Sequence, residues 1–103
     1  MKYQSSIQKI SAIQSLVAEA FNIELLKLLS PSRTGEIAYI RQISMYLCRF
    51  NTDAPLKVIA SEHKRTNHGT VIHASEVIGY DIRKKENVRE KISQLETQIK
   101  NLA

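Results

Sequence analysis

The stretch that decides the fold is "PLKVIASEHKRTNHGTVIHASEVIGYDI", residues 55–82. It divides into two helical segments, 55–63 and 67–82, joined by the three-residue link "KRT". Pro55 suits a first helical turn, where its missing amide has no partner to lose, and Asn67 can cap the second segment through its side-chain oxygen. Two helices joined by so short a turn have the dimensions of a helix-turn-helix.

The second segment starts with small and polar residues: Asn67, His68, Gly69 and Thr70. In a helix-turn-helix, this end of the second helix faces base edges in the major groove of DNA. Asn67 offers a donor and an acceptor to an adenine edge or a cytosine amine, His68 can donate to a purine acceptor, and Thr70 can bond a phosphate. On spacing alone, an ordinary capped helix start explains the same residues equally well.

Gly69 is unusual in a first helical turn, because glycine costs a helix interior about 1 kcal/mol relative to alanine. Either the backbone approaches DNA closely at this point, or the glycine is simply tolerated on the surface. The sequence favours neither explanation over the other.

Before the central stretch, apolar residues recur every three or four positions, a spacing typical of amphipathic helices. We expect a first helix to begin at a cap formed by Ser5 or Ser6 and to end at Asn22, which tolerates the left-handed conformation. A short helix in "IELLKLL", residues 23–29, precedes the turn-rich loop "SPSRTG", residues 30–35.

A third helix is expected from Thr34 or Gly35 to the stop signal "NTD", and its wide apolar stripe indicates a central position. After the charged run "RKKEN", a last helix over 87–102 has apolar residues alternately four and three apart. With the two helices of the central stretch, the sequence predicts an all-α fold of about six helices in one domain, 1–103.

Length and charge narrow the class of protein. A chain of 103 residues, 43% of them hydrophobic, is long enough for one domain with a single core. Its 15 Lys and Arg against 10 Asp and Glu give a net charge of +5. A small basic domain points to a polyanionic partner, most often nucleic acid.

Several other classes are not supported by the sequence. Cys48 is the one cysteine and lies in the apolar run "ISMYLCRF", so it is expected to be a buried thiol in a reduced, cytoplasmic setting. His63, His68 and His73 are each five apart and do not share a helix face, so we expect no metal site. No catalytic constellation, membrane span or signal peptide stands out, which predicts neither an enzyme nor a cofactor.

The central stretch also resembles a known motif. Residues 65–74, "RTNHGTVIHA", are similar to the pattern Gly-Arg-Asp-His-Thr-Thr-Val-Leu-His-Ala in the C-terminal DNA-binding domain of the bacterial replication initiator DnaA. Upstream, "IQSLVAEAFNIELLKLLS" and "SRTGEIAYIRQISMYL" are similar to that family's opening and to its Arg-(Ser/Thr)-x-x-(Val/Ile)-Ala-x-x-Arg-Gln-x-x-Met-x-Leu segment. The register runs without a gap from Ile13 to about Ile78.

This resemblance implies a TrpR/DnaA-like helix-turn-helix that binds double-stranded DNA at a DnaA-box-like site, in replication initiation or its regulation. It implies that Arg33 enters the minor groove and that Thr34 bonds a phosphate. Arg41 and Gln42 match the family's Arg-Gln pair at the start of the third helix, where the Arg meets the DNA backbone. Lys57 stands where the family usually has proline and would gain a phosphate contact. The expected interface residues are Arg33, Thr34, Arg41, Gln42, Leu56, Lys57, Lys64, Arg65, Thr66, Asn67, His68, Gly69 and Thr70.

The departures from the family pattern fall on this interface. Asn67 replaces an aspartate, and Gly69 replaces a threonine that reads bases. Lys64 and Arg65 replace two glycines, and Gly35 replaces a basic residue. The turn is therefore more basic and the minor-groove arm weaker, so the scaffold and the docking mode carry over whereas the base preference does not.

DnaA is a multidomain ATPase, whereas this sequence has no Walker motif, so we expect no ATP hydrolysis. The start at Met1 and the helical tail favour a complete stand-alone domain, and a fragment of a larger initiator is the alternative. The last helix either closes on the first or pairs two copies into a homodimer that reads two half-sites. The rival function is a protein-interaction module that has lost base readout at Gly69 and Gly35.

Overall fold

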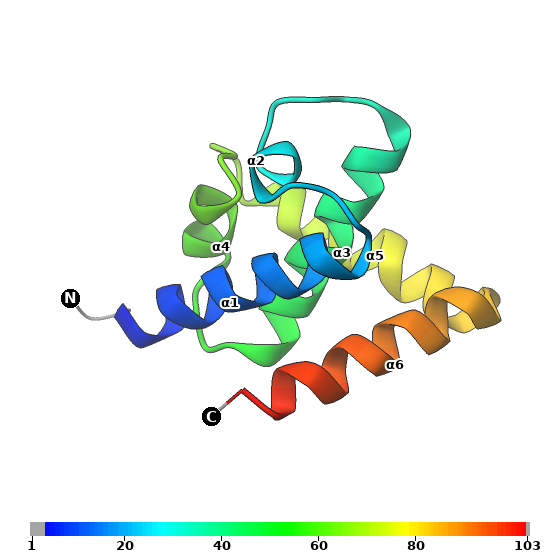
Figure 1. The fold of residues 1–103 in the computed structure, drawn as a ribbon. Helices are drawn as coiled ribbons and strands as arrows, with labels where there is room; N and C mark the ends of the chain where they lie inside the picture. The colour runs from blue at the N-terminus through cyan, green and yellow to red at the C-terminus, as the bar shows by residue number, and fades with distance from the viewer. Residues whose placement is uncertain (1–3, 103) are drawn as a thin grey trace.

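The computed structural model describes residues 4–102, and every regular element in that range is a helix (Figure 1). The helices are α1 (Gln4–Ala20), α2 (Leu25–Leu28), α3 (Gly35–Asn51), α4 (Leu56–Glu62), α5 (Gly69–Lys84) and α6 (Glu86–Lys100). The predicted all-α fold of six helices is confirmed. None of these helices combines the length and the apolar character needed to cross a membrane.

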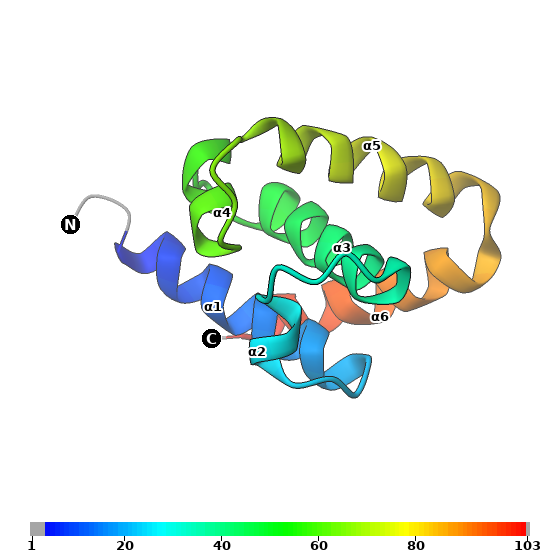
Figure 2. The ribbon, with the colours of Figure 1, turned by 90° about the horizontal axis from the view of Figure 1, so that it is seen from above.

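Helix α3 lies at the centre and contacts each of the other five helices. Figure 2 shows it between α5 on one side and α1 with α6 on the other. Its wide apolar stripe supplies much of the core: Ile37, Ile40, Ile43, Met45, Leu47 and Cys48 are all buried. Burial raises the pKa of Cys48 to about 12, because desolvation disfavours the thiolate. The cysteine is therefore the inert buried thiol that the sequence predicted.

The ends of α1 agree only in part with the sequence prediction. Asn22 ends the helix with a φ of 56°, and the amide of Ile23 donates to the Ala18 carbonyl at 2.9 Å. This is the left-handed termination expected for asparagine. The predicted cap at Ser5 or Ser6 is wrong, because the chain is already helical at Gln4 and both serines lie inside the first turn.

Helix α6 closes the fold. Its apolar face, Ile92, Leu95 and Ile99, is buried against α1, α3 and α5 of the same chain. The expected helix over 87–102 is thus present with its ends shifted by one or two residues. Of the two roles predicted for this helix, closing on the first helix is the one that the described residues display.

A buried polar contact fixes α4 to α3. The ring of His63 is fully buried and lies 2.7 Å from the Ser44 hydroxyl through Nε2 and 2.9 Å from the Ile59 carbonyl through Nδ1. Because a carbonyl only accepts, Nδ1 carries the proton and the serine hydroxyl donates to Nε2. Burial, together with the smaller effects of the nearby Arg41 and Arg65 charges, lowers the pKa of His63 to about 4 against the opposing effect of the Ile59 bond.

This contact predicts a specific pH dependence of stability. An unfolded histidine takes up a proton near pH 6.5, whereas folded His63 takes it up only near pH 4. The unfolded state therefore binds more protons between these values, and the free energy of unfolding falls by about 1.4 kcal/mol per pH unit as the pH drops below 6.5. Above that range His63 contributes no pH dependence.

Chemical denaturation between pH 7.5 and pH 5 measures this effect. His63→Phe should be less stable at neutral pH, since Ser44 loses its partner, and should lack most of the acid-side slope. His68→Gln removes an exposed imidazole and should keep the slope. An unchanged slope in His63→Phe would contradict the assignment.

Candidate nucleic-acid interface

The two helices of the predicted helix-turn-helix are α4 and α5, but the link between them is longer than expected. It spans residues 63–68 rather than three residues, because each helix is closed by a specific capping arrangement. At the end of α4, Lys64 adopts a φ of 61°, and the amide of Arg65 donates to the Ala60 carbonyl at 2.8 Å. Glycine is usual at such a position, so no local signal in the sequence marked it.

The start of α5 confirms the predicted cap. The side-chain oxygen of Asn67 accepts a hydrogen bond from the Gly69 amide at 2.8 Å, and the Thr70 hydroxyl donates to the Asn67 carbonyl at 2.9 Å. A Cβ at Gly69 would stand 3.1 Å from that Asn67 oxygen, tighter than most such contacts. Glycine therefore leaves room for the cap, a local reason that the sequence did not reveal.

This cap changes what Asn67 offers to DNA. From the sequence, Asn67 was expected to offer both a donor and an acceptor to a base edge. In the structure one of the two lone pairs of the oxygen accepts from the Gly69 amide, whereas the side-chain NH₂ group has both of its donors to offer to a base. The side chains of Asn67 and His68 are both exposed, and Figure 2 shows the start of α5 at the edge of the molecule away from α6.

A groove joins the start of α5 to the α2–α3 loop. One part of the groove is lined by Pro31, Ser32, Arg33, Ala38, Arg41, Arg65 and Thr70. The adjoining part shares four of these residues and adds Gln42, Met45, Asn67, Gly69 and His73. Seven expected interface residues are thus brought together from segments far apart in sequence. His73 lines this part together with residues of α3, and its side chain is exposed.

The other expected residues lie outside this groove. Thr34, Lys57, Lys64, Thr66 and His68 are exposed, and Leu56 is half-buried against the core. Lys64, Thr66 and His68 alternate along the turn with the groove residues Arg65 and Asn67. The turn thus carries exposed polar side chains both inside the groove and beside it.

The groove is basic and lacks acidic residues. Three arginines line it and no carboxylate does. Within residues 4–102 the only ion pair, Lys85 with Asp81, lies at the far end of α5, about 18 to 24 Å from its start at 1.5 Å per residue. A surface with unpaired cations, hydroxyls and amides suits the phosphates and base edges of a nucleic acid.

Arg41 is buried, although the resemblance implies that it contacts the DNA backbone. Only 4% of the residue is exposed. Its guanidinium donates to the carbonyls of Leu28 at 2.9 Å, Ser30 at 2.6 Å and Ser32 at 3.2 Å. Burial lowers its pKa, and the nearby charge of Arg65 lowers it further. The DNA-backbone contact implied by the resemblance would require the guanidinium of Arg41, whose nitrogens are here bonded to carbonyls of the protein.

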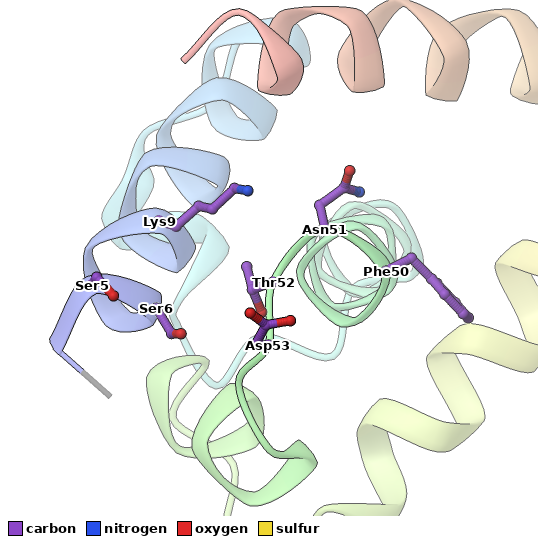
Figure 3. A pocket seen from close by; sticks show the side chains of 7 residues that line it. All are labelled: Ser5, Ser6, Lys9, Phe50, Asn51, Thr52 and Asp53. Atoms are coloured by element: carbon purple, nitrogen blue, oxygen red, sulfur yellow. The ribbon is translucent and has the colours of Figure 1, made fainter. Parts of the chain in front are cut away.

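A second hollow lies between the start of α1 and the end of α3 (Figure 3). Its lining residues are Ser5, Ser6, Lys9, Phe50, Asn51, Thr52 and Asp53. It shares no residue with the groove, and it contains one lysine and one aspartate beside short polar side chains and a phenylalanine. It therefore lacks the excess of positive charge that marks the groove.

Comparison with known proteins agrees with this geometry. Residues 10–78 match the family described as bacterial DnaA protein helix-turn-helix. The chain is also similar to the crystal structure of a DNA replication initiation factor, with 32% sequence identity and a TM-score of 0.84 over 95% of this chain. The match spans 30% of that protein's length. The chain therefore belongs to the bacterial DnaA helix-turn-helix family of DNA-binding domains.

Proposed function

We propose that this domain binds double-stranded DNA sequence-specifically, at a site similar to a DnaA box, in the initiation of replication or its regulation at the bacterial nucleoid. The observation that carries the proposal is the groove that joins the start of α5 to the α2–α3 loop, lined by arginines and free of carboxylates. In this role the domain acts by occupying its DNA site and does not hydrolyse ATP.

The start of α5 enters the major groove. A groove about 12 Å wide admits a helix, and the first residues of that helix reach the base edges. The NH₂ group of Asn67 donates to a base acceptor, while the exposed ring of His68 reads a purine acceptor or touches a thymine methyl. The backbone at Gly69, which has no side chain to intervene, lies between them and Thr70.

The α2–α3 loop serves the neighbouring minor groove. Arg33 is exposed near the end of this loop and lines the same groove as Thr70. Narrow, A·T-rich minor grooves concentrate negative potential and attract an inserted arginine. The phosphates between the two DNA grooves then face Lys57, Lys64, Arg65, Thr34 and Thr70, with Gln42 as a further polar contact.

Selection of duplexes from a random pool tests this function directly. We expect an enriched sequence whose affinity falls with salt, the logarithm of the binding constant changing by about 0.9 per phosphate contact for each tenfold rise in salt. If duplexes bind but no sequence is enriched, the domain is a non-specific DNA binder. Absence of binding at low salt would overturn the proposal in favour of a protein-interaction module.

Substitutions separate base reading from phosphate binding. His68→Ala should reduce the preference for the selected sequence by about 1–3 kcal/mol. Lys57→Ala should weaken selected and random duplexes alike and lower the salt slope by about 1. Titrations of both variants against both duplexes check this, and a full sequence preference in His68→Ala would show that α5 is docked differently.

Lys64 should show opposite effects on stability and on binding. Its left-handed backbone costs a residue with a Cβ about 1 kcal/mol more than glycine. Lys64→Gly should therefore raise the free energy of unfolding by about that amount, while the lost charge weakens binding to all duplexes and lowers the salt slope. Denaturation curves and salt titrations measure the two effects.

Lys64→Ala is the matched control. It removes the same charge and keeps the Cβ, so it should weaken binding as much as Lys64→Gly without the gain in stability. If both variants bind as tightly as the wild type, Lys64 does not contact phosphate.

A further inference from the structure

We infer that Arg41 is a positioning residue for DNA binding: it shapes the α2–α3 loop that carries Arg33 and makes no contact with DNA of its own. The inference rests on the proposed function and assigns Arg41 a role different from the backbone contact that the family resemblance implies. It makes Arg33 dependent on a side chain buried beneath it.

The guanidinium of Arg41 is bonded through every one of its nitrogens. All three of its nitrogens donate to carbonyls of the chain that leaves α2, those of Leu28, Ser30 and Ser32, at distances between 2.6 and 3.2 Å. The carbonyls come from alternate residues and converge on one planar group. A guanidinium presents five N–H donors in a fixed fork, which suits such convergence.

Few other hydrogen bonds hold the α2–α3 loop to the rest of the molecule. Pro31 has no amide, and the side-chain bonds of Ser30, Ser32 and Thr34 stay within the chain from Lys27 to Thr34. Besides Arg41, the hydrogen bond from a distant residue to the described loop is that of Arg65 to the Ser30 carbonyl, at 3.4 Å. Arg41 therefore supplies most of the tertiary hydrogen bonding of the loop.

The Arg41 guanidinium also acts on the peptide next to Arg33. The Ser32 carbonyl, which Arg41 binds, belongs to the peptide bond that leads directly into Arg33. Fixing that peptide sets the direction in which the exposed Arg33 side chain leaves the loop. A loop held in one conformation before binding loses less conformational entropy when Arg33 enters a groove.

The charge of Arg41 is far less accessible than the charges of its two neighbours in the groove. The Arg41 residue is 4% exposed, whereas Arg33 is exposed and Arg65 is half-buried on the same groove. The cations placed to meet phosphates are therefore these two, with Arg41 behind them. Its charge adds to the potential of the groove while its donors remain bonded to the loop.

Hydrogen exchange of the free protein tests the positioning role without DNA. Arg41→Lys keeps the charge and loses the fork, so the amides of residues 32–34 should exchange about tenfold faster while those in the middle of α5 do not change. Lys57→Ala, which removes an exposed cation on α4, should leave the exchange of the loop unchanged. Equal loop exchange in Arg41→Lys and the wild type would overturn the inference.

A double-mutant cycle tests the connection to DNA. Arg33→Ala and Arg41→Lys should each weaken binding of the selected duplex by about tenfold, and the double variant should bind no more weakly than the weaker single variant. Lys57→Ala combined with Arg33→Ala should show multiplied effects. If the losses of affinity multiply when Arg41→Lys is combined with Arg33→Ala, the two residues act independently. If Arg41→Lys alone keeps nearly full affinity, the charge at this position is sufficient. Either result would mean that Arg41 acts on DNA by its charge and would overturn the inference.

The wild-type protein gives a readout that needs no variant. In nitrogen-detected spectra, the Nε–H of Arg41 should be slow to exchange in the free domain and should keep its chemical shift when duplex is added, whereas that of Arg33 should move. A large shift at Arg41 on binding would contradict the inference. Failure of the wild type to bind any duplex would instead refute the proposed function, and the loop exchange would still decide the role of Arg41.

Discussion

The structure depends on the burial of α3, because every other helix packs on it. A helix with so wide a buried surface has to bury polar side chains as well, and each of these needs a partner. Tyr39 donates to Asp81 near the end of α5 at 2.6 Å, Arg41 bonds the α2–α3 loop, and Ser44 bonds His63 at the end of α4. Arg41 and Ser44 thereby fix the loop and the turn beside the groove, while Tyr39 holds the other end of α5.

Buried and exposed polar groups have different positions in this arrangement. Buried polar groups of α3 hold the loop and the turn, and cations on that loop and turn are exposed to solvent, where the proposed partner would meet them. Because no carboxylate lines the groove, its positive charges repel one another in the free domain, and a polyanion relieves that repulsion. The same absence of acidic neighbours leaves the cations free to exchange counterions for phosphates.

Much of the fold could be predicted from the sequence because the signals are local. Apolar spacing predicted six helices, and the asparagines at 22 and 67 predicted a helix end and a cap. What the sequence did not show depends on distant partners or on unfavourable backbone. The hydrogen bond of His63 joins residues 19 apart, and the loop contacts of Arg41 depend on how α3 packs. Lys64 takes a conformation that favours glycine, so the turn looked shorter than it is.

Under the proposed function, stability and DNA binding make opposite demands on the turn between α4 and α5. A glycine would accept the left-handed conformation at position 64 without cost, whereas lysine does so under strain. The strained side chain is exposed and charged, next to Arg65 and the cap of α5. A residue that opposes its own backbone is retained most easily where its side chain serves a partner. The position of this strain, beside the start of α5, thus supports the surface as the one that meets DNA.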